Sequence, residues 1–188
     1  MTRVEVLIAP QISEADIHQL ASLFCLVFPD DERDERAFAQ SMCRAWLSYS
    51  GPPELGGRRF VLRDGGRIVA NANLMPRPIL TARGREVIAG LCAVMSHPDV
   101  RGRGFGKATV RAALDCVDAD EFPFALFQTS DARGFYEKLG CQVVSNPIVN
   151  SLDIDNPKAN PFWEPWVMCY TARRGLPDGE IDLLGRGY

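Results

Sequence analysis

Residues 94–107 read VMSHPDVRGRGFGK and decide the fold, because an apolar run turns here through a basic, glycine-rich loop into a helical pattern. From Phe105 to Val117 apolar side chains recur at helical spacing, so the loop sits at a helix N-terminus, where free N–H groups and the helix dipole favour an anion. Glycines without a Cβ let a ligand lie directly against the backbone. The loop holds the glycines 102, 104 and 106 and the cations Arg101, Arg103 and Lys107. It predicts a cradle for a diphosphate.

Spacing excludes two other phosphate loops. A Walker loop needs Gly-x-x-x-x-Gly-Lys followed by Ser or Thr, whereas Arg101 stands five residues before Gly106 and Ala108 follows the lysine. A dinucleotide fingerprint needs Gly-x-Gly-x-x-Gly near the start of a domain, whereas Lys107 occupies the third glycine's place and the loop lies past mid-chain.

Length and charge restrict the kind of protein. At 188 residues, 46% hydrophobic and 24% charged, the chain predicts a single globular domain over residues 1–188. It shows no signal peptide and no run of about 20 apolar residues, so we expect a cytoplasmic protein that does not bind a membrane. A net charge of −3 argues against a nucleic-acid partner, while the basic residues gathered in 101–111 indicate one local anionic ligand.

Cysteine and histidine usage argues against a metal centre. The six cysteines are widely spaced with no Cys-x-x-Cys pair, which predicts free, mostly buried thiols: Cys25, Cys43, Cys92, Cys116, Cys141 and Cys169. Only His18 and His97 supply imidazole, so we expect no metal.

Hydrophobic periodicity predicts an alternation of strands and helices. Ser13 and Asp16 form a capping box for a helix that ends at Pro29, and a second helix follows the acids of 30–35. The expected strands cover 3–9, 59–62, 67–72, an extended run from about 78 to 95 that turns at 83–84, 122–128, 141–144 and 166–171. Ser130 or Asp131 is expected to cap a short helix through Leu139, with Gly140 as its stop.

Two motifs carry a resemblance to a known family. The loop Arg101–Gly106, preceded by His97 and Pro98, closely resembles the pyrophosphate loop of the Gcn5-related N-acetyltransferases (GNAT). Residues 130–140, SDARGFYEKLG, are similar to the family's helix with an aromatic-Tyr-x-x-x-Gly pattern. The resemblance implies an α/β fold with a mixed, mostly antiparallel sheet of about seven strands and helices on both faces.

The resemblance also implies an activity, an acetyl-CoA-dependent transfer of an acetyl group directly to a primary amine of a small molecule. The positions that match the family's acetyl-CoA contacts are Val94, Met95, Ser96, Arg101, Gly102, Arg103, Gly104, Phe105, Gly106 and Lys107. The backbone N–H of Val94 is the candidate to polarise the acetyl carbonyl. Tyr136 matches the proposed general acid, although a core tyrosine on an apolar helix face has the same pattern. Members of the family are frequently homodimers.

A narrower similarity concerns the acceptor. Residues 176–188, LPDGEIDLLGRGY, and the segment Phe28–Asp31 resemble parts of the aminoglycoside 2'-N-acetyltransferases. That resemblance implies that Asp30, Asp31 and Tyr188 bind an amino sugar. The acids can equally serve as the negatively charged start of a helix.

One departure bears on catalysis. Cys92 and Gly90 stand where relatives carry a glutamate proposed as base. The amine then arrives deprotonated or loses its proton to water, or another acid serves, such as Asp30, Asp31 or Glu86. The alternative is a non-catalytic acyl-CoA-binding module of the same fold.

Overall fold

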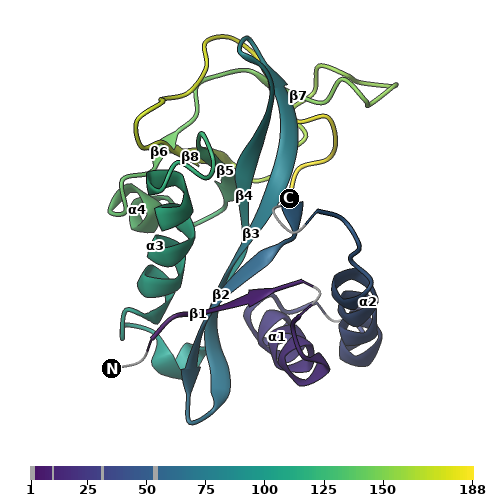
Figure 1. The fold of residues 1–188 in the computed structure, drawn as a ribbon, viewed down its shortest axis with the longest axis vertical. Helices are drawn as coiled ribbons and strands as arrows, with labels where there is room; N and C mark the ends of the chain where they lie inside the picture. The colour runs from purple at the N-terminus through teal and green to yellow at the C-terminus, as the bar shows by residue number, and fades with distance from the viewer. Residues whose placement is uncertain (1–2, 10, 31, 53–54) are drawn as a thin grey trace. The chain divides into compact units, whose positions relative to one another are not determined.

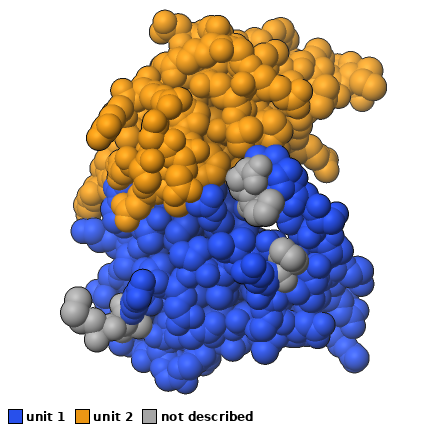
Figure 2. Space-filling view, in the orientation of Figure 1, with its two compact units in different colours: residues 1–75, 93–113 blue, residues 76–92, 114–188 orange. Residues whose placement is uncertain are grey.

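The computed structural model describes residues 3–9, 11–30, 32–52 and 55–188. The chain forms two compact units, residues 1–75 with 93–113 and residues 76–92 with 114–188 (Figure 2). Two long strands, β3 (Arg67–Thr81) and β4 (Gly84–Ser96), contribute residues to both units. The single domain expected over residues 1–188 stays a prediction.

The helices of the first unit begin at side-chain caps. Ser13 accepts a hydrogen bond from the Asp16 N–H at 3.1 Å, so its role as the N-cap of α1 (Glu14–Val27) is confirmed. The Asp16 carboxylate accepts from the Ser13 hydroxyl, whereas a full capping box would bond it to the Ser13 N–H. Asp34 accepts from the Ala37 N–H at 2.6 Å and caps α2 (Glu35–Leu47). The two helices lie side by side (Figure 1).

The first unit's strands pair antiparallel in the order β1 (Glu5–Ile8), β2 (Arg58–Asp64) and β3. A register shift between Leu62 and Arg63 marks a bulge in the β2–β3 ladder. The apolar stripes of α1 and α2 cover one face of this sheet, in a core that includes Ile17, Leu20, Val61, Ile68 and Met95.

Helices cover both faces of this part of the sheet. Met95 packs into the core under α1, and the next residue, Ser96, contacts Gly106 in α3 (Phe105–Asp118). Because successive strand residues point to opposite faces, α1 and α3 lie on opposite sides of β4. The predicted helices on both faces are therefore confirmed.

The second unit continues the sheet. β5 (Ala125–Thr129) pairs parallel with β4 and antiparallel with β8 (Trp166–Tyr170), which pairs antiparallel with the edge strand β6 (Gln142–Val143). β9 (Ile181–Asp182) pairs with β3 and, in parallel, with β7 (Ile148–Val149). The mixed, mostly antiparallel sheet is confirmed. Among the described residues this sheet has nine strands, more than the expected seven, because the two-residue strands β7 and β9 leave no periodic signal.

Three expected boundaries were wrong. The extended segments near 67–72 and 78 form one strand, β3, rather than two. β5 begins at Ala125 rather than at Phe122. Phe122 and Phe124 are buried in the segment before the strand, so they extend the apolar run without belonging to β5. Neither Ser130 nor Asp131 caps the short helix α4 (Arg133–Glu137), whose N-cap is Ala132 and makes no side-chain cap bond. Gly140 follows that helix with φ +88°, as expected of a stop.

The six cysteines are free thiols, three of them buried and three half-buried. Across residues 3–9, 11–30, 32–52 and 55–188, no helix is long and apolar enough to cross a membrane. Over the same ranges, no three His, Cys, Asp or Glu side chains gather in a way that could hold a metal ion.

Candidate active site

The glycine-rich loop in the first unit joins β4 to α3 through tight turns. A single 3₁₀ turn, Pro98–Val100, begins it, and the Arg103 N–H donates to the Val100 carbonyl at 3.2 Å. Gly102 and Gly104 adopt φ of +78° and +80°, a region that L-residues with side chains rarely enter. The Gly104 carbonyl accepts from the Ala108 N–H at 3.0 Å, so α3 begins directly after it with a glycine N-cap that has no side chain to satisfy the first-turn N–H groups.

Gly106 permits a close approach between the first turn of α3 and the end of β4. A Cβ placed on Gly106 would lie 2.6 Å from the Ser96 Oγ. A side chain at this position would therefore require either the Ser96 hydroxyl or the first turn of the helix to shift. Ser96 and the first turn of α3 consequently lie in close contact.

Arg103 is already engaged within the loop's own unit. Its Nη1 lies 2.8 Å from the Asp64 Oδ2, and its guanidinium stacks 4.5 Å from the centre of the Phe105 ring. Both partners of the ion pair are about half exposed, at 51% and 47%. Arg101 and Lys107 are exposed, and within the described part of the chain their side chains make no ion pair or hydrogen bond. Of the loop's three cationic side chains, Arg101 and Lys107 thus have no such partner among the described residues, and Arg103 is paired with Asp64.

The strand that precedes the loop is kinked at Ala93. This residue has φ +47°, and its carbonyl accepts a 2.7 Å hydrogen bond from the Asn71 side chain on β3. Beyond the kink, Met95 is 1% exposed and its side chain belongs to the core, so only its backbone is available to a ligand. Val94 and Ser96 are half-buried.

Tyr136 lies in the second unit, on α4. It is 6% exposed, and its ring packs 4.5 Å from that of Phe127 and 5.0 Å from that of Phe135. Burial, and next the thiols of Cys141 and Cys92, raise the pKa of Tyr136 well above its ordinary value of 10. No described residue hydrogen-bonds its hydroxyl. The phenol therefore keeps its proton at neutral pH and has it free to donate.

Comparison with known proteins decides the family. The model of the acetyltransferase (GNAT) domain matches residues 10–144. The chain belongs to the GNAT acetyltransferase family.

Solved GNAT structures have the same fold. The GNAT N-acetyltransferase YhbS from Escherichia coli, in complex with CoA, is 13% identical with a TM-score of 0.61, and the match covers 97% of this chain and 91% of that one. A GNAT acetyltransferase from Brucella melitensis, in complex with acetyl-CoA, is 13% identical with a TM-score of 0.58 and coverages of 96% and 95%.

Other matches are larger proteins. The Gcn5-related N-acetyltransferase from Kribbella flavida is 18% identical, with a TM-score of 0.57, over 76% of this chain. This chain spans 33% of its length and 33% of that of a probable N-acyltransferase from Enterococcus faecalis. No curated protein sequence matches the chain.

In this GNAT protein the second unit brings Tyr136, Cys92 and Tyr188 together. The half-buried Cys92 thiol is close enough to raise the pKa of both phenols. The titratable groups that act on the pKa of Tyr136 are therefore two thiols, Cys141 and then Cys92, and not a carboxylate.

Tyr188 is partly buried and packs against the core of the GNAT domain's second unit. Its hydroxyl donates to the Leu126 carbonyl at 3.0 Å, and Arg77 stacks 4.9 Å from its ring centre. Burial raises the pKa of Tyr188, and the Arg77 charge offsets part of that rise. Gln128 holds the tail in place, because its amide donates to the Tyr188 carbonyl at 3.1 Å and accepts from the Trp163 N–H at 2.9 Å.

The acidic segment before α2 is used locally. Asp30 accepts from the Glu32 N–H and forms a 3.0 Å ion pair with Arg33, whose guanidinium also stacks on the rings of Phe24 and Phe38. Asp31 lies outside the described residues. The other candidate base, Glu86, accepts a 3.0 Å hydrogen bond from the Thr81 hydroxyl.

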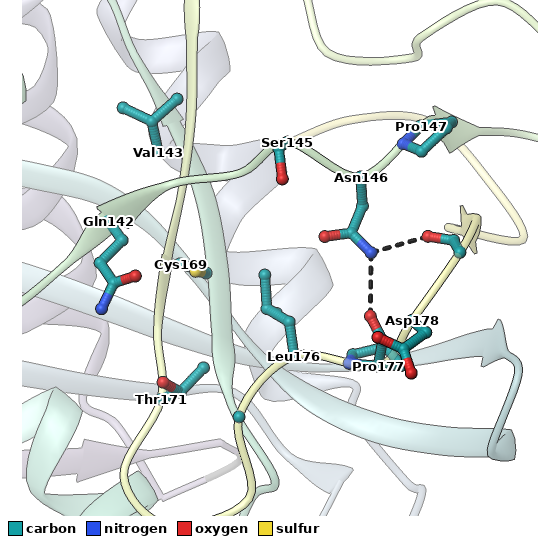
Figure 3. A pocket seen from close by; sticks show the side chains of 12 residues that line it. Gln142, Val143, Ser145, Asn146, Pro147, Cys169, Thr171, Leu176, Pro177 and Asp178 are labelled. Carbon is teal, nitrogen blue, oxygen red and sulfur yellow. Dashed lines mark hydrogen bonds between the residues drawn. The ribbon is translucent and has the colours of Figure 1, made fainter.

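Two cavities lie apart from the predicted residues. One of about 540 Å³ opens beside β6 and β8, where the Asn146 amide donates to the carbonyls of Pro177 and Gly179 (Figure 3). Cys169 lines it, and burial raises the pKa of this thiol to about 11, so it stays protonated. The other, of about 330 Å³ in the first unit, is lined by His18, His97 and Arg67.

Sequence reasoning missed Asn71, Gln128 and Arg77. The first two had a signal, because each is an amide side chain next to apolar strand residues. Asn71 alternates with Ala70, Ala72 and a second amide, Asn73, and Gln128 directly follows the apolar run Phe124–Phe127. Buried amides are retained where they hydrogen-bond, so such a residue predicts a specific contact. Arg77 had none, since it stands between two prolines like a loop residue.

Proposed function

We propose that this protein is an acetyl-CoA-dependent N-acetyltransferase that acetylates a primary amine of a small molecule, with amino sugars as the first class of acceptor to test. The observation that carries the proposal is the loop at the start of α3. Its glycines at φ +78° and +80°, its uncapped helix N-terminus and its three cations suit a diphosphate such as that of CoA.

The reaction is direct transfer. The amine nitrogen attacks the thioester carbonyl, the C–N bond forms, the C–S bond breaks, and the CoA thiolate leaves. Tyr136 gives its phenolic proton to the sulfur and regains one from solvent, while the amine loses its proton to water. Backbone N–H groups around Val94 stabilise the oxyanion, a type of contact worth about 3 kcal/mol. Positioning the two reactants supplies about 7–11 kcal/mol in favourable cases, so the reaction does not require a carboxylate base.

The amino-sugar acceptor rests on the tail and the acids near residue 30. Tyr188 and Asp30 both have partners within the protein, Leu126 and Arg33, so either role in acceptor binding needs the residue to serve two partners.

The test is thiol release from acetyl-CoA across aminoglycosides, polyamines and amino-acid amides, with acetyl-CoA binding measured by calorimetry in parallel. Arg103→Ala is expected to weaken binding, while Arg85→Ala, an equal charge change at an exposed residue of β4 outside the loop, is expected to leave it unchanged. Equal affinities for both variants would remove the loop assignment. Binding without release from any acceptor would instead favour the non-catalytic acyl-CoA-binding module, which the absence of an acid at positions 90 and 92 also allows.

A further inference from the structure

Asn71 combines two energetic costs with one hydrogen bond at a point beside the candidate site. It is a polar side chain with 0% exposure in the middle of β3. Its Nδ2 donates to the Ala93 carbonyl at 2.7 Å, which fixes the orientation of the amide. Its Oδ1 is buried and, among the described residues, has no hydrogen-bond partner. A buried carbonyl without a partner lowers the stability of the folded state. The hydrogen bond from the Nδ2 of Asn71 to Ala93 is therefore the reason to expect a role for this amide.

Ala93 carries a cost of its own. Of the non-glycine residues described, it is one of three with positive φ, at +47°, and the other two, Asp120 and Leu184, lie outside the long strands. A non-glycine residue keeps such a conformation only when its surroundings impose it. The Asn71 amide takes the Ala93 carbonyl, and a side-chain donor at this point lets the strand leave the regular ladder.

The kink sets the direction of the backbone that follows it. Val94 comes directly after Ala93, and Ser96 then meets the first turn of α3 at Gly106. A residue with positive φ inside a strand turns the next peptide plane away from the pleat, so the Val94 N–H depends on how firmly the Ala93 carbonyl is held.

We propose that Asn71 is a positioning residue for acyl transfer, because its amide holds the Ala93 kink and thereby aims the backbone at Val94 toward the acyl thioester. This inference rests on the proposed function and adds a residue to it. Asn71 acts through Ala93 and touches no reacting atom. Its contribution concerns the acyl arm of the ligand and not the phosphates, which the loop at 101–107 would hold.

A two-by-two set of variants tests the proposal: wild type, Asn71→Ala, Ala93→Gly, and the double variant. Glycine adopts positive φ without strain, so in the Ala93→Gly background the kink does not depend on the hydrogen bond from Asn71. We expect Asn71→Ala to raise the Kd for acetyl-CoA about tenfold in the wild-type background and less than about threefold in the Ala93→Gly background. Asn71→Ser, which is too short to span the same gap, serves as a second variant if the alanine variant fails to fold.

ADP is the control ligand, because it offers a diphosphate without a pantetheine arm. Its Kd is expected to change less than about twofold in Asn71→Ala, since the loop is untouched. Equal effects of Asn71→Ala in both backgrounds would refute the positioning role, as would equal losses of acetyl-CoA and ADP binding or a loss of melting temperature with no change in binding. Failure of the proposed function looks different, because wild-type protein would then bind no acetyl-CoA.

Discussion

The ion pair between Arg103 and Asp64 leads to a prediction about ligand affinity. Replacing Asp64 with Asn removes the carboxylate 2.8 Å from Arg103 without changing the size of the side chain. Because a bound diphosphate competes with Asp64 for the same guanidinium, the variant is expected to bind CoA more tightly than wild type. The size follows from exposure. Both side chains are about half exposed, at 51% and 47%, and pairs in such positions contribute about 0.2–1 kcal/mol. Affinity should therefore rise by a factor of about 1.4 to 5.

Calorimetric titration with CoA at low salt measures this change. Raising the salt to about 1 M shortens the Debye length to about 3 Å and should shrink the difference between variant and wild type. Glu32→Gln, at an exposed residue of the same unit, makes the same change in net charge without touching Arg103 and controls for long-range attraction. Weaker binding by Asp64→Asn would refute the reasoning, because it would mean that Asp64 holds Arg103 in its binding position.

Three further predictions concern single side chains. Gly106→Ala should weaken CoA binding, since its Cβ would lie 2.6 Å from the Ser96 Oγ, and adding Ser96→Ala should restore most of it; calorimetry of both variants decides. Tyr136→Phe should slow thiol release at every pH between 6 and 9 without shifting the pH profile. The folded-state pKa of Tyr136 is raised above that of the unfolded chain, near 10, so its contribution to stability is complete below about pH 10 and is lost as the pH rises. Chemical unfolding of Tyr136→Phe should accordingly show a shallower loss of stability above pH 10. Tyr188→Phe removes one hydrogen bond to the Leu126 carbonyl and should lower the free energy of unfolding by about 1 kcal/mol, measured in urea.

The elements with local chemical signals could be predicted from sequence. Ser13 with Asp16 predicted the start of α1, the acids before residue 35 predicted the start of α2, and Gly140 predicted the end of α4. The glycine loop also folds as its spacing requires, with two glycines in positive φ and the third against Ser96. These features depend on contacts between near neighbours in the chain, so the sequence contains them directly.

The long strand β3 was not predictable from local signals. Pro76 and Pro78 suggested a break, because proline cannot donate to a β-ladder. The pairing of β3 with β2 ends at Leu74 and its pairing with β9 falls at Leu80, so β3 continues through both prolines between these two partners. The extent of β3 thus depends on where partner strands that are distant in the sequence begin and end.

The sequence named candidate site residues, which stay predictions, but not their surroundings. The loop pattern indicated Arg103 and the family resemblance implied Tyr136, yet neither showed that Asp64 pairs with Arg103 or that the Cys92 thiol raises the pKa of Tyr136. The positive φ at Ala93 could not be predicted either, because alanine, unlike glycine, does not indicate a residue with positive φ. Each of these facts joins residues more than 20 positions apart, for which a single sequence holds no record.

The order of the two units along the chain affects how the protein folds during its synthesis. The first unit needs residues 93–113, which follow the 17 residues 76–92 of the second unit. A ribosome adding about 5–20 residues per second takes about 2–8 s to pass from residue 76 to residue 113. During that delay α1 and α2 lack Met95 for their core, and β3 lacks β4 along one edge. An unpaired strand edge can pair with other chains, so during this interval, before residues 101–107 have been made, the nascent protein is exposed to aggregation.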